Sequence, residues 1–179
     1  MGSMRSWAEH GVTEHDWTIS GTLQVHGATY GLGFTARAEL ARFLDFAAGA
    51  DGQPYAARLT RHRAVRPVTE QDRLSELDFH FDPAHGVGAA LLRVADGPDR
   101  ASSYWFTGGS PDGARLAATV PADIELVYDT WNPAETRFPR SSWITLPELW
   151  SAVLEWAFGE HYPPDVVSWT AVPPPTGRL

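Results

Sequence analysis

The chain contains no cysteine, no lysine and no long apolar segment, and these absences exclude several classes of protein. Without cysteine there is no disulfide framework, no thiolate metal ligand and no cysteine nucleophile, and such a composition suits a reducing compartment. No apolar run approaches the roughly 18 residues of a membrane span, and the amino terminus lacks a basic and apolar signal pattern. We therefore expect a soluble cytoplasmic protein with no membrane partner.

Positive charge is also scarce. The chain has 14 basic residues, all of them arginine, against 22 acidic residues, and its formal net charge is −8. A general nucleic-acid binder normally has a basic surface, so nucleic acid is not the expected partner. An acidic surface instead suits a basic protein partner. One arginine cluster is open to two interpretations, a solvated strand face or a contact for acidic groups: Arg58, Arg61, Arg63 and Arg66.

The 179 residues are enough for one domain that buries about two-thirds of its unfolded surface. We predict a single α+β domain over residues 4–171 and a Pro-rich tail over 172–179. The predicted architecture is a mainly antiparallel sheet of about six strands with two principal amphipathic helices packed on it.

The most strongly patterned segment lies near the carboxyl end. Thr145 and Glu148 have the spacing of a capping box, and apolar residues follow at helical spacing. Gly159 stands where a left-handed residue ends a helix, and Pro163 with Pro164 prevents the helix from resuming. The sequence therefore predicts a helix that begins after Thr145, ends near Gly159 and leads into a short strand over 165–169.

Alternation of apolar and polar residues predicts strands in the rest of the chain. The expected strands are 17–25 and 29–34, joined as a hairpin, then 55–60, and a three-strand meander of 77–81, 87–94 and 103–107, with a further alternating segment at 124–128. Thr35 is placed to cap the other principal helix, which runs to about Ala48. The glycine-rich sequence over 108–113 predicts a loop, and 69–76 is also polar loop.

Residues with the potential for chemistry do not form a recognised catalytic set. His80 and His85, beside Asp78 and Asp82, resemble part of a metal site, but no third imidazole stands at a recognised spacing and a hairpin turn explains them equally well. Ser110 has neighbouring glycines but lacks the strand, turn and helix of a nucleophile elbow. We therefore expect no metal site and no nucleophilic serine.

Two other residue patterns could suggest a site, a phosphate-binding loop and a pair of catalytic carboxylates. Gly31 and Gly33 precede a helix, but a phosphate-binding loop needs a third glycine and a parallel βαβ unit. Paired carboxylates in polar connections are ordinarily solvated, although the sequence alone leaves a glycosidase pair open: Asp96 with Asp99, and Asp129 with Glu135. We therefore predict no cofactor and no catalytic residue, which is typical of a protein-binding module.

The order of the motifs resembles the immunity protein 1 family of bacterial polymorphic toxin systems. The carboxyl-terminal motifs that carry the resemblance are Phe138-Pro139, Ser142, the helix over 146–158, Gly159, Pro163 or Pro164, Val167 and Trp169. The remaining ones are the helix over 35–48, His85-Gly86-Val87-Gly88, Tyr104-Trp105-Phe106 and Gly108-Gly109. The chain departs from the family pattern in an extra amino-terminal strand, a double proline and a tail beyond Trp169.

The resemblance implies a non-enzymatic antidote that binds the catalytic domain of a cognate toxin, often a nucleic-acid deaminase, and occludes its active site. The resemblance transfers no catalytic residue, because the family has none. The expected toxin contacts are exposed residues of the connection before Phe138 and of the glycine-rich loop, namely Trp131, Asp129, Glu135 and Asp112. A small enzyme or ligand-binding α+β domain remains the main alternative, followed by an interaction protein unrelated to toxins.

Overall fold

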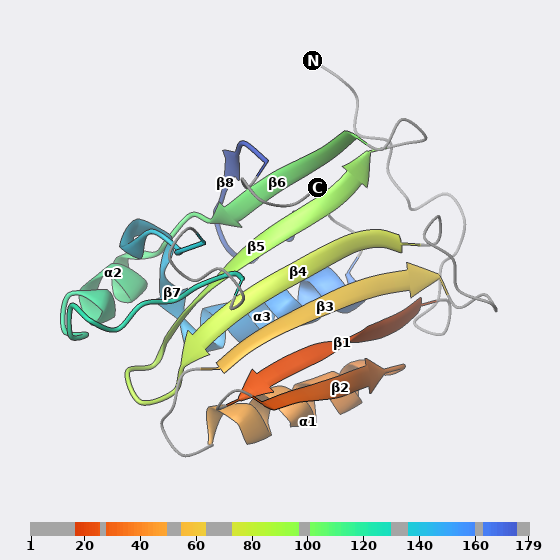
Figure 1. The fold of residues 1–179 in the computed structure, drawn as a ribbon, viewed down its shortest axis with the longest axis horizontal. Coiled ribbons are helices and arrows are strands. Elements are labelled where there is room, and N and C mark those ends of the chain that lie inside the picture. The colour runs from red at the N-terminus through yellow and green to blue at the C-terminus, as the bar shows by residue number, and fades with distance from the viewer. Residues whose placement is uncertain are drawn as a thin grey trace.

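The protein has an α+β fold in which three helices pack on an eight-stranded antiparallel sheet (Figure 1). The computed structural model describes residues 17–25, 28–49, 55–63, 73–96, 101–129, 136–159 and 163–174. The predicted fold class is therefore confirmed. In the described part of the chain the sheet has eight strands instead of about six, and there are three helices instead of two.

The strand order is β2-β1-β3-β4-β5-β6-β8, and β7 pairs with β5 beside this path. The strands are β1 (Trp17–Val25), β2 (Ala28–Phe34), β3 (Tyr55–Arg63), β4 (Arg73–Asp82), β5 (Val87–Asp96), β6 (Ala101–Thr107), β7 (Ile144–Thr145) and β8 (Trp169–Val172). The helices are α1 (Arg37–Ala48), α2 (Pro111–Ala117) and α3 (Leu146–Phe158), with a 3-10 turn at Arg140–Ser142. The predicted hairpin β1–β2 and the meander β4–β5–β6 are both present.

Two hydrophobic cores lie on opposite faces of the sheet. Alternate residues of β3, β4 and β5 point towards α1 and α3, and this first core includes Leu59, Phe79 and the fully buried Trp156. The intervening residues of β5, such as Leu91, point to the other face, where α2 and the connection to α3 cover them in a second core around Trp143. The second core does not extend over β1 and β3, so this face of the sheet is polar where those two strands form it.

Local signals predicted α3 well. The Thr145 hydroxyl accepts from the Glu148 amide, and the Glu148 carboxylate accepts from the Thr145 amide at 2.8 Å, so the capping box is confirmed. The prediction that Gly159 is left-handed is wrong, because its φ is −83°. Steric crowding explains why glycine occupies this position, since a Cβ would collide with the carbonyl oxygen of Glu155.

Two further predictions are corrected by packing. The glycine-rich segment is not all loop: Ser110 caps α2, accepting from the Gly113 amide, and Pro111 occupies the first turn, where it removes no hydrogen bond. The closing strand begins at Trp169 instead of ending there, because Trp169–Val172 pairs with β6. Val172, the first residue of the predicted tail, therefore belongs to the sheet edge.

The remaining differences are local. The 124–128 segment is not a strand and makes one bridge, between Val127 and Arg137. β4 begins at Arg73, within a predicted loop, because it pairs with β3. The cap of α1 is Ala36 and not Thr35; Thr35 instead donates from its amide and hydroxyl to Glu39. Within the described ranges no helix is long and apolar enough to cross a bilayer.

Candidate functional site

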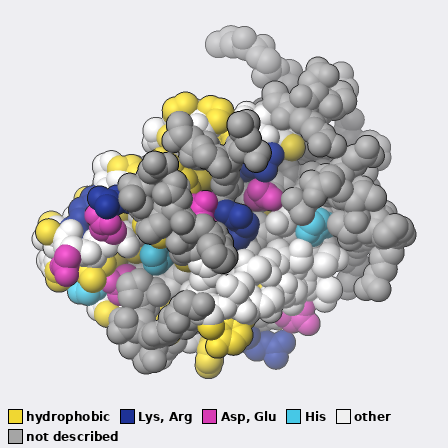
Figure 2. Space-filling view, in the orientation of Figure 1, with side chains coloured by type: hydrophobic (Ala, Val, Ile, Leu, Met, Phe, Trp, Pro, Cys, Tyr) yellow, Lys and Arg dark blue, Asp and Glu magenta, His cyan; other side chains and the backbone are white. Residues whose placement is uncertain are grey.

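The face of β1, β3 and β4 that points away from α1 and α3 carries a polar surface. Strand register places Thr22 beside Arg58 and Arg58 beside Asp78, so these three side chains share one face. We call the cluster of Thr22, Gln24, Arg58, Asp78, Tyr128 and Asp129 the polar face. Figure 2 shows arginine and acidic side chains close together near the centre of this side of the molecule.

An ion pair organises the polar face. The Arg58 Nε donates to Asp78 Oδ1 at 2.6 Å, and Asp78 is 3% exposed while 43% of the Arg58 side chain remains accessible. Burial lowers the pKa of Arg58, but the carboxylates of Asp78, Glu76 and Asp129 outweigh it and raise the pKa above its ordinary value. The guanidinium is therefore a fixed positive charge set between negative groups.

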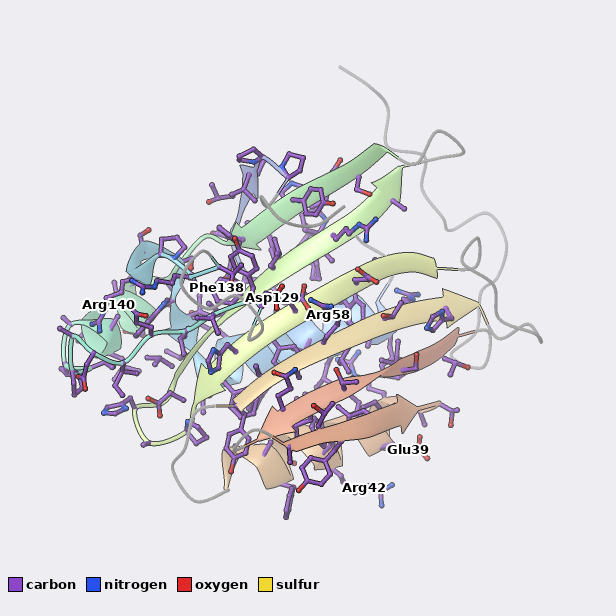
Figure 3. All side chains as sticks on the ribbon, in the orientation of Figure 1. Glu39, Arg42, Arg58, Asp129, Phe138 and Arg140 are labelled. Carbon is purple, nitrogen blue, oxygen red and sulfur yellow. The ribbon has the colours of Figure 1, made fainter. Side chains whose placement is uncertain are left out.

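The connection after α2 closes one side of the polar face. The Val127 amide donates to His80 Nδ1 at 2.7 Å, which fixes this segment on β4. The Tyr128 amide donates to the Thr136 carbonyl at 2.8 Å, and the Thr136 hydroxyl donates to the Asp129 carbonyl at 2.7 Å. These bonds hold Asp129 near Arg58, as Figure 3 shows.

Between the strands and this connection lies a shallow hollow that is open to solvent. Its volume is about 70 Å³, and its lining includes all six residues of the polar face together with Ala56, Ala57, Phe79 and Val127. Small-molecule sites usually enclose about 300–1,000 Å³. The hollow therefore fits a single side chain better than it fits a cofactor.

Further polar pairs extend along the same face of the sheet. Arg93 on β5 bonds to Glu76 on β4 at 3.1 Å. Ser20 on β1 and His62 on β3 are 2.8 Å apart. Because each pair joins two strands, the backbone fixes the spacing of these polar groups before any partner binds.

The suggested metal ligands do not converge. His80 points to Val127, whereas His85 Nδ1 lies 2.6 Å from Asp82 Oδ2 in the turn between β4 and β5. The Asp82 Oδ1 also accepts from the Ala84 amide at 3.0 Å, so the carboxylate shapes the turn. No group of three or more potential ligands is close enough to hold a metal ion among the described residues.

Ser110 likewise has a structural partner. Its hydroxyl donates to Glu148 Oε2 at 2.8 Å and accepts from the Gly113 amide at 2.9 Å, which ties the start of α2 to the start of α3. Partial burial raises the pKa of Glu148, but the bonds from the Thr145 amide and the Ser110 and Thr145 hydroxyls hold it below its ordinary value. The carboxylate is a structural acceptor for both helix starts.

The four predicted contact residues are not all brought together. Asp129 is on the polar face, whereas Asp112 lies at the start of α2 and pairs with Arg115 at 2.7 Å. Trp131 and Glu135 lie outside the described residues. The same holds for Asp99, the possible carboxylate partner of Asp96. The arginine cluster with Arg58 was left open as a contact for acidic groups, but its pairing with Asp78 was not predicted, because only strand register shows that residues 20 positions apart are neighbours.

The residues that carry the family resemblance mostly support the fold. Phe138 packs in the second core, and the Trp169 Nε1 donates to the Pro164 carbonyl at 2.8 Å. Gly109 has a φ of +75°, and a Cβ there would collide with the Ser141 carbonyl oxygen. In comparisons with known proteins, no family model, no curated protein and no solved structure matches the chain.

Proposed function

We propose that this protein is a non-enzymatic immunity protein that binds the catalytic domain of a cognate bacterial toxin through the polar face and occludes its active site. The observation that carries the proposal is the cluster of Arg58, Asp78 and Asp129 around an open hollow on a rigid sheet. These groups are fixed by strand pairing and by the bonds of the connection, so little ordering is required when a partner binds.

Electrostatics favours a basic partner. The net charge of −8 attracts a positively charged surface over a long range and increases the rate of encounter. A toxin that acts on nucleic acid, such as a deaminase, needs a basic substrate site. An acidic antidote is therefore complementary to the surface that it would have to cover.

The hollow adds a short-range contact. A volume of about 70 Å³ accepts the end of one side chain, and Asp129 and the Arg58–Asp78 pair are among the residues that line it. An arginine or lysine of the toxin entering the hollow would meet Asp129 beside the Arg58–Asp78 pair. Anchors of this kind contribute much of the affinity in protein interfaces.

The test begins with the product of the adjacent gene. The protein is expected to bind that product with micromolar or tighter affinity and to suppress its toxic activity. Asp129→Asn is expected to weaken binding about tenfold. Asp165→Asn removes the same charge at an exposed position on the approach to β8 and is expected to change binding little. A neighbour without toxicity, or equal effects of the two substitutions, would contradict the proposal.

A further inference from the structure

Strand β2 forms one edge of the sheet, and among the described strands it pairs only with β1. Its seven residues, Ala28–Phe34, include no charged residue and no proline. Natural sheets usually protect an edge with charge, proline or a bulge, because an exposed strand can pair with another chain. The opposite edge, β8, is followed directly by Pro173 and Pro174. Proline therefore follows the β8 edge, whereas the β2 edge contains neither proline nor charge.

The helix-facing side of β2 is apolar and incompletely covered. Tyr30 is 56% exposed, and Phe46 of α1 is 77% exposed. Phe43 packs on Phe34 with ring centroids 5.4 Å apart, so α1 covers one end of the strand. Figure 2 shows an apolar patch at the edge where β2 and α1 lie in Figure 1, with basic and acidic side chains beside it.

The other side of β2 carries two glycines that face open space. A Cβ built on Gly31 or Gly33 would meet nothing within 4 Å, and neither residue has a positive φ. By contrast, a Cβ on Gly21 of β1 would collide with the Arg58 carbonyl oxygen. Glycine within a strand often marks a place where another backbone approaches closely.

We propose that β2 pairs antiparallel with β2 of a second copy, which continues the sheet across a two-fold axis at Gly31. In this register Tyr30 lies opposite Leu32 of the second copy, and both residues are on the helix-facing side. An uncharged strand pairs with itself without opposing like charges, whereas most other surfaces of two chains of charge −8 repel each other.

The exposed aromatic side chains supply part of the surface that a stable dimer needs. Aromatic side chains bury about 150–250 Å² each, so the exposed fractions of Tyr30 and Phe46 correspond to roughly 200–330 Å² per protomer. A pair of seven-residue strands, about 23 Å long, adds its backbone and the remaining side chains. A standard interface needs about 800 Å² per partner. The proposal does not depend on the proposed function, because it concerns the chain alone.

The test is sedimentation equilibrium of the full chain over a range of concentrations up to about 100 µM. The unmodified chain is expected to be a dimer. Gly31→Lys places two like charges at the two-fold axis, where a side chain has space, and is expected to give a folded monomer. Thr170→Lys makes the same charge change on exposed β8 and is expected to remain dimeric. Phe46→Ala is expected to weaken dimerisation about tenfold.

Two results would overturn the inference. The first is an unmodified chain that stays monomeric throughout the range; if Gly31→Lys then abolishes toxin binding, the β2 edge is assigned to a strand of the toxin. The second is a Gly31→Lys variant that, with unchanged circular dichroism, dimerises as strongly as the unmodified chain, since another surface would then mediate the contact.

Discussion

The Arg61 guanidinium on β3 donates a hydrogen bond to the backbone carbonyl of Trp156 on α3 at 3.0 Å. A second bond from the same nitrogen reaches the Gly159 carbonyl at 3.2 Å. The arginine is 4% exposed, and burial lowers its pKa to about 10. α3 has no basic residue in its last turn, so Arg61 supplies the positive charge that stabilises the carboxyl end of a helix dipole.

Replacing Arg61 therefore tests how α3 is held on the sheet. Arg61→Met is expected to lower the free energy of unfolding by roughly 2–3 kcal/mol, because the buried Trp156 carbonyl and the part-buried Gly159 carbonyl lose a charged donor. Urea denaturation followed by circular dichroism measures the change. Arg42→Met on the exposed side of α1 is the matched control and is expected to change stability by less than about 0.5 kcal/mol. Equal stability of the two variants would contradict this role.

His80 predicts a dependence of stability on pH. Burial lowers its pKa from 6.5 to about 4, against the opposing charge of Asp82, and the Val127 amide donates to Nδ1. Between pH 6.5 and 4 the unfolded chain binds a proton that the folded chain excludes. Stability is thus expected to fall as pH decreases through this window, by about 3 kcal/mol in total.

The control for this pH effect is His80→Gln, which retains an acceptor for the Val127 amide but does not titrate. The difference in unfolding free energy between the two proteins, measured at several pH values from 4 to 7, isolates the histidine from the carboxylates. A difference that stays constant with pH would show that His80 does not resist protonation.

The glycine at position 109 is expected to be indispensable for stability. Gly109→Ala combines a left-handed φ of +75° with a collision against the Ser141 carbonyl oxygen, so the free energy of unfolding should decrease by roughly 2–4 kcal/mol. Gly49→Ala is the control, because its φ is −88° and its added Cβ would make ordinary contacts at 3.7 Å. The control should be neutral or slightly stabilising. Thermal denaturation distinguishes the two, and similar melting temperatures would refute the argument.

The capping box of α3 gives a prediction about helix termini. Thr145→Ala removes the acceptor of the Glu148 amide and one of the donors to its carboxylate, so stability should fall by about 1 kcal/mol. Ser151→Ala in the same helix removes only an exposed bond to the Pro147 carbonyl and should change stability very little. Chemical denaturation of both variants measures the difference. A larger loss for Ser151→Ala than for Thr145→Ala would contradict the capping role.

Local sequence signals predicted α3 but not α2. At α3 the capping residues, the apolar spacing and the prolines all indicate the same boundaries, and the predicted start is confirmed. At α2 the glycines of 108–113 indicated loop, although Ser110 and Pro111 are a standard helix start. The helix forms there because the second core covers Ala117 and because Ser110 bonds to Glu148.

The polar face was the hardest feature to predict. Asp129 was identified as a contact residue from its place in a polar connection, but its neighbours Arg58 and Asp78 come from different strands. Their pairing depends on the register of β3 with β4, and a shift of one residue would place Asp78 on the opposite face. No signal within a single segment specifies that register.

The sequence by itself determined the α+β class, the β1–β2 hairpin, the β4–β6 meander and the capped helix α3, because alternation, turn residues and caps act over a few neighbouring positions. Only the tertiary structure decided where β8 pairs, which residue closes the end of α3 and which charges meet on the polar face. Those outcomes depend on contacts between residues far apart in the chain, and such contacts become defined only when the strands and helices pack together.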